Sequence, residues 1–289
     1  MKSHGALSLD PFHDMPGRQE TDFVCITDSK VLVYLIHGIT GAPVEMSSLS
    51  RKLSCENGWD VNVTTLPGHG TNLSGLGRTT EQDWRAHVQR QLSFIRDRYE
   101  YVFAVGLGAG ALLALEASTV VRVDGIGALS PTFIHNGWNT PWAQVPERKP
   151  YHARGTVRGR PHDWCARGKV ANGAATPPSS ATTIAYPAIS LGTLTEIDRL
   201  IMRVLPGLHD VTTPTVILQA RTDDMTNPRN SSIVYNAISS QDRLLIVLDD
   251  CFHVVSVGDQ QEAVAAHMAP FFRLHMKTEF IPQQMMVNF

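Results

Sequence analysis

The sequence predicts an α/β fold in which helices cover both faces of a mostly parallel sheet, with an insertion over the sheet. Three observations predict it. Short apolar runs of strand length recur along the chain, and segments of helical length separate them. In addition, 43% of the 289 residues are hydrophobic, which is enough for one large core. The alternation breaks only between residues 131 and 190, where we place the insertion.

The first strong strand is the run Val-Leu-Val-Tyr-Leu-Ile at 31–36, between a charged segment and a His-Gly pair. A continuous apolar run of this length is typical of a strand that is buried on both faces. Because proline cannot donate to a sheet, Pro214 fits only the first position of its strand. Similar runs predict further strands at 61–65, 101–105, 125–129, 214–219 and 244–248.

Helical patterns fill the gaps between these runs. The segment 80–83 resembles a capping box, and apolar residues follow it at helical spacing: Trp84, Val88, Leu92 and Ile95. Three further segments predict helices, at 109–118, 230–238 and 259–272. We therefore expect a core at 29–130 and 191–276. Around it we expect an N-terminal extension at 1–28, a cap insertion at 131–190 and a tail at 277–289.

Composition argues against several classes of partner. The formal net charge is -2, with 25 Lys+Arg against 27 Asp+Glu, so no basic surface for nucleic acid is expected. No run approaches the roughly 18 apolar residues that span a bilayer, and residues 1–28 lack a signal-peptide pattern. We expect a cytoplasmic protein without stable membrane insertion, and the sequence makes no prediction of its oligomeric state. The cysteines have neither CxxC nor zinc spacing, so we expect reduced thiols and no metal: Cys25, Cys55, Cys165 and Cys251.

The sequence Gly106-Leu107-Gly108-Ala109-Gly110 ends a predicted strand and runs directly into a predicted helix. A strand followed by small-x-nucleophile-x-small and a helix is the pattern of a nucleophile elbow, where Gly-x-Ser-x-Gly is expected. Here the frame is complete, but glycine stands at the centre. The alternative is a phosphate or dinucleotide cradle. The spacing is GxGxG rather than GxGxxG, and no acidic residue ends a later strand at the required distance, so no cofactor is expected.

Three further segments follow predicted strands. After the first comes His37-Gly38-Ile39-Thr40-Gly41, a turn that can direct backbone N–H groups into a site. The N–H groups of Ile39 and Ala109 would then form an oxyanion hole. Asp223 and His253 follow later strands. In isolation such an aspartate is as often a cap or turn residue, and a loop histidine is more often structural. The chain order of elbow, aspartate and histidine favours a catalytic set.

These motifs resemble the carboxylesterase and monoacylglycerol-lipase branch of the α/β-hydrolase superfamily, which is serine aminopeptidase-like. The resemblance covers roughly 30–130 and 190–275, and residues 193–205 resemble the helix that closes the cap in that family. Besides the elbow and the turn at 37–41, it is carried by Leu66-Pro67-Gly68-His69-Gly70, Gln219–Pro228 and Phe252-His253-Val254. It implies an α/β-hydrolase fold, a small-molecule acyl or ester ligand, and Asp223 and His253 as catalytic partners. It also implies that Gly108 replaces the family's serine.

Three functions are compatible with this pattern. Without a hydroxyl at position 108 no acyl-enzyme can form there, so hydrolysis would be weak, with His253 activating water directly. A second hypothesis is a non-hydrolytic enzyme, in which the histidine abstracts a proton beside the oxyanion hole in an elimination or cyclisation. A third is a binding relative without turnover. Other candidate nucleophiles have no better claim: Cys251 lies off the elbow, and Ser48 and Ser74 are predicted in a helix and a loop.

Overall fold

The computed structural model describes residues 12, 14–70, 72–135, 152–153, 188–257 and 260–276. Most of the predicted cap insertion at 131–190 and the whole predicted tail at 277–289 therefore lie outside the described residues. Cys165 and the pair Gly258-Asp259, which falls within the second family-like region, lie outside them as well.

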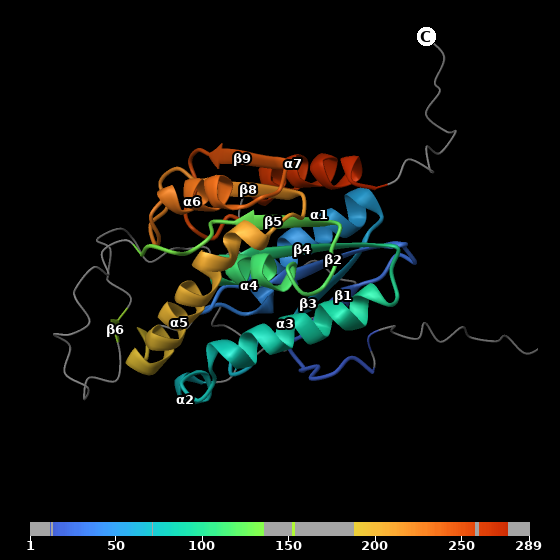
Figure 1. The fold of residues 1–289 in the computed structure, drawn as a ribbon. Coiled ribbons are helices and arrows are strands. Elements are labelled where there is room, and N and C mark those ends of the chain that lie inside the picture. The colour runs from blue at the N-terminus through green and yellow to red at the C-terminus, as the bar shows by residue number, and fades with distance from the viewer. Residues whose placement is uncertain are drawn as a thin grey trace, which may run out of the picture.

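A seven-stranded sheet forms the centre of the molecule, in the order β1-β3-β2-β4-β5-β8-β9 (Figure 1). Strand β1 pairs antiparallel with β3, and the other neighbours are parallel. The strands are β1 (Phe23–Cys25), β2 (Val31–Ile36), β3 (Asp60–Thr64), β4 (Tyr101–Leu107), β5 (Gly125–Leu129), β8 (Thr215–Ala220) and β9 (Arg243–Leu248). The predicted strands from residue 31 onward are confirmed, with ends that move by one or two residues.

Strand β1 lies inside the segment 1–28 that the sequence pattern set apart as an extension. It pairs with β3 over Phe23 to Cys25, so the sheet begins before the predicted boundary. A separate two-stranded antiparallel sheet is made by β6 (His152–Ala153) and β7 (Ala188–Ile189).

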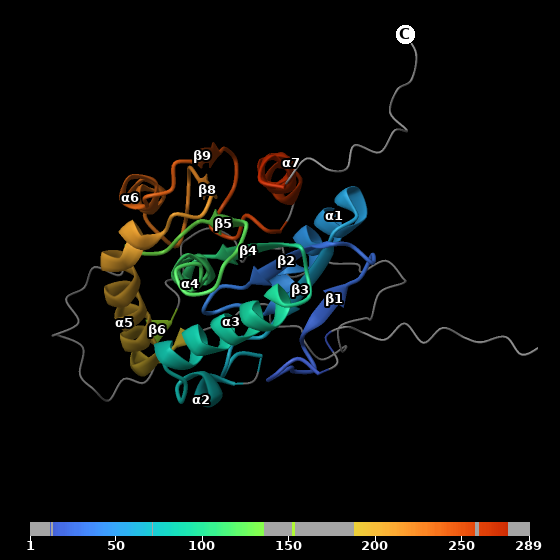
Figure 2. The ribbon, with the colours of Figure 1, turned by 45° about the vertical axis from the view of Figure 1, so that its right-hand side comes forward.

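Helices pack on both faces of the sheet, which is plain in the turned view of Figure 2. On one face lie α1 (Ser47–Asn57) and α7 (Gln260–Leu274), which contact each other. The other face carries α3 (Glu81–Arg96), α4 (Ala109–Ala117) and α5 (Leu191–Gly207), and α6 (Arg229–Ala237) packs on β8 and β9. The short elements are η1 (Pro43–Met46), α2 (Leu73–Leu76) and η4 (Leu208–Asp210).

The two faces have separate cores because neighbouring residues of a strand point to opposite sides. In β2, Leu32, Tyr34 and Ile36 join the core under α3, α4 and α5. Val31, Val33 and Leu35 of the same strand join the core under α1 and α7. All six are buried, as expected for a continuous apolar run in a central strand.

The sequence patterns predicted most of the helices correctly. A capping box between Thr80 and Asp83 begins α3, and the predicted apolar stripe of that helix is buried. Ser48 lies in α1 as predicted. Ser74 was predicted in a loop but lies in α2, a helix of only 4 residues that is too short to show helical periodicity in the sequence. Among the described helices, none has the length and apolar character needed to cross a bilayer.

Candidate active site

Gly108 occupies the sharp turn between β4 and α4, with φ 60° and ψ −117°. The glycines on either side let the helix fold back tightly onto the sheet. A β-carbon on Gly106 would lie 2.0 Å from the carbonyl oxygen of Gly110, and one on Gly110 would lie 2.5 Å from the carbonyl oxygen of Ile36. Both distances are far below contact, so the turn requires glycine at these two positions.

Two polar atoms from neighbouring segments lie close to the side-chain position of Gly108. A β-carbon there would be 3.0 Å from Nε2 of His253 and 3.4 Å from Oγ1 of Thr132. His253 follows β9 and Thr132 follows β5. Because the carboxyl ends of parallel strands meet at one edge of a sheet, three loops distant in sequence converge on this point.

Behind His253 lies Asp223, in the loop after β8. Nδ1 of His253 is 2.8 Å from Oδ2 of Asp223, and the two side chains are 8% and 0% exposed. A carboxylate only accepts hydrogen bonds, so Nδ1 of the ring is the donor. In the neutral ring this leaves the lone pair of Nε2 directed toward Gly108.

The Asp223 carboxylate is held by several donors besides the histidine. Its Oδ1 accepts from the backbone N–H groups of Met225 at 2.9 Å and Thr226 at 2.7 Å. Its Oδ2 accepts from Nε2 of Gln219 at 2.9 Å and from the Thr226 hydroxyl at 3.0 Å. Burial raises the pKa of Asp223, but the hydrogen bond and charge of His253, together with the two backbone N–H groups, bring it below its ordinary value. The carboxylate is therefore ionised at neutral pH.

Asp224 has a different contact. Its Oδ1 accepts the backbone N–H of His253 at 3.0 Å. The two adjacent aspartates thus hold the ring and the main chain of His253 separately. Of the two, Asp223 is the one whose carboxylate bonds the imidazole.

The turn at 37–41 faces the beginning of α4, and two buried histidines hold it. Nδ1 of His37 donates to the Gly38 carbonyl at 2.8 Å, while its Nε2 accepts from the N–H of Leu66 at 3.0 Å. Nε2 of His69 bonds the Ile39 carbonyl at 2.5 Å. Burial, and then the neighbouring His69, hold the pKa of His37 well below its usual range, so its ring is neutral.

The N–H groups predicted to form an oxyanion hole are not used elsewhere in the described part of the fold. Among the described residues, the N–H groups of Ile39 and Ala109 have no hydrogen-bond acceptor. Ala109 is the first residue of α4, where backbone N–H groups lack partners within the helix. Gly38 lies beside the end of β4, since a β-carbon there would be 3.7 Å from the Leu107 carbonyl oxygen.

The model of the family described as serine aminopeptidase, S33, matches residues 27–260. The chain belongs to the serine aminopeptidase S33 family. It is 25% identical over 244 residues to the thermostable monoacylglycerol lipase of Bacillus sp. (strain H-257). The aligned region covers 84% of this chain and 90% of the lipase. It is 24% identical over 235 residues to the carboxylesterase of Bacillus subtilis (strain 168). This alignment covers 80% of this chain and 88% of the esterase.

Solved structures share the fold. A soluble variant of monoglyceride lipase from Saccharomyces cerevisiae superposes with a TM-score of 0.70 at 16% identity, covering 89% of this chain and 92% of the lipase. A metagenome-derived lipolytic enzyme gives a TM-score of 0.68 at 21% identity, covering 90% and 99% of the two chains. The predicted α/β-hydrolase fold is confirmed.

Sequence reasoning missed three residues near the site of this S33-family protein. One is Thr132, described above. Another is Glu45, which is 3% exposed and packs over the turn, so that a β-carbon on Gly41 would meet its Oε2 at 1.8 Å. The third is His135, whose pKa is lowered to about 4 by burial and by His253. None belongs to a motif. Thr132 and His135 reach the site through the packing of distant segments, and Glu45 lies just after the turn at 37–41.

Cys251 has no role as a nucleophile in this arrangement. Its side chain is buried, and its thiol bonds the Leu248 carbonyl at 3.4 Å. Burial and then the nearby carboxylates, Asp223 first, raise its pKa to about 11, so the reactive thiolate is scarce at neutral pH.

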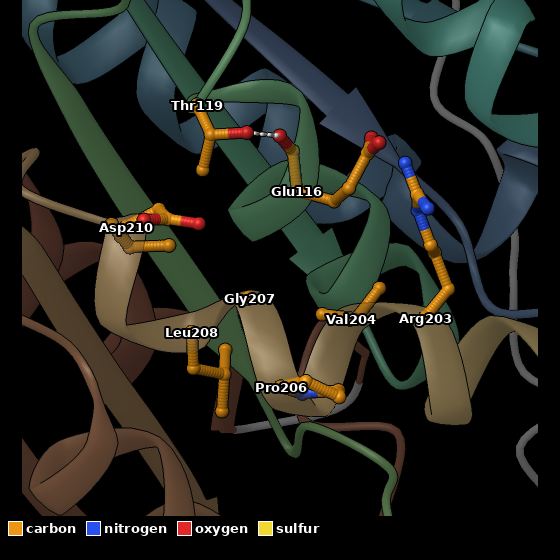
Figure 3. Close-up of a pocket in the computed structure, with 9 residues that line it drawn as sticks. Glu116, Thr119, Arg203, Val204, Pro206, Gly207, Leu208 and Asp210 are labelled. Atoms are coloured by element: carbon orange, nitrogen blue, oxygen red, sulfur yellow. Dashed lines mark hydrogen bonds between the residues drawn. The ribbon is translucent and has the colours of Figure 1, made fainter.

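A cavity of about 300 Å³ lies at the opposite end of α4 from Gly108 (Figure 3). The Thr119 hydroxyl donates to the Glu116 carbonyl there, and Arg85 and Gln89 already bond the Glu116 carboxylate. The described residues that line it include no histidine or cysteine. It is lined by Glu116, Thr119, Arg203, Val204, Pro206, Gly207, Leu208, Asp210 and Val211. The imidazole–carboxylate pair of His253 and Asp223 lies at Gly108 and not at this cavity.

Proposed function

We propose that this protein slowly hydrolyses carboxylic esters, either small esters or esters with an acyl chain. In this reaction His253 activates a water molecule beside Gly108. One observation carries the proposal. Nε2 of His253 points at the side-chain position of Gly108 from 3.0 Å, while Asp223 holds the other ring nitrogen. A base is thus oriented toward position 108, which carries no side-chain nucleophile.

Several features support placing Gly108 at the nucleophile position of the family. It sits on a strained strand-to-helix turn between two obligatory glycines, which is the setting of a nucleophile elbow. Two curated relatives are a monoacylglycerol lipase and a carboxylesterase. A β-carbon at Gly108 would already touch His253, so the water that we propose requires the imidazole to move back from the turn. Hydrolysis would then use water directly, without an acyl-enzyme.

The proposed reaction has two stages. First, His253 Nε2 takes a proton from the water as its oxygen attacks the ester carbonyl carbon, and the carbonyl π electrons move to the oxygen. The N–H groups of Ile39 and Ala109, at the positive end of α4, stabilise that oxyanion. Second, the carbonyl re-forms, the bond to the alcohol oxygen breaks, and the proton on Nε2 passes to the leaving alkoxide. Asp223 stabilises the imidazolium between these stages.

The experiment compares three proteins on 4-nitrophenyl acetate and butyrate: the native chain, His253→Ala and Gly108→Ser. We expect slow hydrolysis by the native chain, on the order of 10³–10⁴ over the buffer rate, and loss of it in His253→Ala. A fluorophosphonate probe should label Gly108→Ser but not the native chain. If the native chain is inactive and Gly108→Ser is neither active nor labelled, a binding protein is favoured instead. Deuterium exchange into a substrate without hydrolysis would favour the proton-abstraction alternative.

A further inference from the structure

We propose that the Thr132 hydroxyl positions the water that His253 deprotonates, a role that rests on the hydrolysis proposed above. Thr132 lies in the segment after β5, and its Oγ1 is 3.4 Å from the side-chain position of Gly108. It is the second polar group at that point, on a different strand from His253. Both groups border the place beside Gly108 where we put the water, so we assign that water to both of them.

The Thr132 hydroxyl has hydrogen-bonding capacity left over. Its side chain is buried, with 5% exposed. In the part of the chain that the structure describes, its single hydrogen bond is to the Ser130 carbonyl at 3.4 Å. That is longer than the roughly 2.7 Å typical of a hydroxyl donor. A buried hydroxyl with one weak bond is poorly satisfied, and a water at Gly108 would satisfy it.

The segment that carries Thr132 is fixed on both sides of it. On one side, the N–H of Ser130 donates to the Leu218 carbonyl of β8 at 2.8 Å. On the other, the side chain of Asn230 in α6 accepts from the N–H of Ile134 at 2.9 Å and donates to its carbonyl at 3.0 Å. Oγ1 of Thr132 is therefore held in place relative to Gly108 rather than carried on a free loop.

The available donors and acceptors fix both hydrogens of the water. Nδ1–H of His253 is bonded to Asp223, so Nε2 accepts one hydrogen. The Thr132 O–H donates toward Ser130, so its oxygen accepts the other hydrogen. With both hydrogens directed, the lone pairs of the water are free to face a carbonyl carbon. Held by His253 alone, the water would rotate about a single bond.

This role belongs to the glycine-containing site. A serine oxygen is held by its own covalent bond to the backbone, whereas a water needs a second contact to keep its orientation. The Thr132 hydroxyl should therefore matter for hydrolysis by the native chain and matter little for attack by a serine placed at position 108.

The test compares Thr132→Val, which removes the hydroxyl at nearly the same volume, with Thr132→Ser, which keeps it. We expect kcat for 4-nitrophenyl butyrate to fall about 10- to 100-fold in Thr132→Val with KM changed by less than about twofold. Thr132→Ser should recover at least about a third of the native kcat. In a Gly108→Ser background, adding Thr132→Val should change the rate of fluorophosphonate labelling by less than about threefold. Thermal unfolding of each variant checks that it is folded.

Three results would overturn the inference. If Thr132→Val hydrolyses as fast as the native chain while His253→Ala is inactive, the positioning role is wrong and the proposed hydrolysis stands. If Thr132→Val slows labelling of Gly108→Ser as strongly as it slows native hydrolysis, Thr132 merely shapes the site. If the native chain shows no His253-dependent hydrolysis, the proposed function and this role fail together.

Discussion

Nε2 of His253 lies 3.0 Å from the point that a β-carbon on Gly108 would occupy, which is at the short limit of real β-carbon contacts. The imidazole is thus packed directly against the turn at Gly108. Asp223 holds the ring from behind, and Asp224 holds its main chain. The imidazole is therefore oriented as a base toward position 108, although glycine offers no side chain there for it to deprotonate.

Gly108→Ala should abolish hydrolysis and lower stability. The methyl group takes the space that we assign to water and displaces His253 by a few tenths of an ångström. The backbone φ of 60° also disfavours any residue with a β-carbon, at a cost of roughly 1–3 kcal/mol. We expect at least a tenfold loss of ester hydrolysis, measured with 4-nitrophenyl butyrate, and a lower urea midpoint. Unchanged hydrolysis in this variant would show that the reacting water does not occupy the space at Gly108.

Gly110→Ala should destabilise the fold far more than Gly108→Ala. Its β-carbon would lie 2.5 Å from the Ile36 carbonyl oxygen and 2.7 Å from that of His37, and neither backbone atom can move away. A loss of more than about 3 kcal/mol in unfolding free energy is expected, because relief requires α4 to shift from β2. Urea denaturation measures it.

Gly192→Ala is the matched control for that change. Gly192 is also in a helix, α5, but its β-carbon would meet only Oγ of Ser190 at 3.7 Å, an ordinary contact. Alanine is the better helix former by up to about 1 kcal/mol, so this variant should be neutral or slightly more stable. Equal destabilisation by the two variants would contradict the close approach of α4 to β2.

Asp223→Asn should reduce catalysis without unfolding the protein. The amide cannot stabilise an imidazolium, and its N–H₂ group competes with the donor role of Nδ1, so the ring loses its orientation. We expect kcat for ester hydrolysis to fall by about 10²–10⁴ with a modest change in KM. Asp224→Asn is the control, because the amide keeps an oxygen that accepts the His253 N–H. Similar losses of kcat in the two variants would mean that the contact of Asp223 with the imidazole ring has no specific role in catalysis.

The fold and the site differ in how much of them the sequence reveals. Continuous apolar runs marked the central strands, since both of their faces are buried. Strand β1 was missed because it has only 3 residues, all half-buried, and shows no such run. His253 and Asp223 could be singled out as candidates because each follows a recognisable strand. Thr132 could not, because it reaches Gly108 only through the pairing of β4 with β5, and nothing in its local sequence marks that contact.

Stability should fall as the pH drops from about 6.5 toward 4, and His87 should account for part of the loss. Nε2 of His87 bonds the Thr64 hydroxyl at 3.0 Å, and that hydroxyl is 2.6 Å from the hydroxyl of Tyr34 in the core. Burial first, and then the charges of Arg90 and His69, lower the pKa of His87 to about 4. The unfolded chain, whose histidine has a pKa near 6.5, binds more protons between these values, so acid favours unfolding. Above about 6.5 the full stability is present.

The gap between 6.5 and about 4 corresponds to on the order of 3 kcal/mol for His87. His37 and His69 act in the same direction, since burial lowers the pKa of both. Urea denaturation at pH 7 and pH 5 measures the slope, which His87→Gln should flatten because glutamine does not titrate and can still bond Thr64. His209→Gln is the control, as that ring is 73% exposed, and its profile should match the native one. An equal slope in the native chain and His87→Gln would mean that acid acts on the fold through other groups, since a neutral buried imidazole at position 87 requires the two slopes to differ.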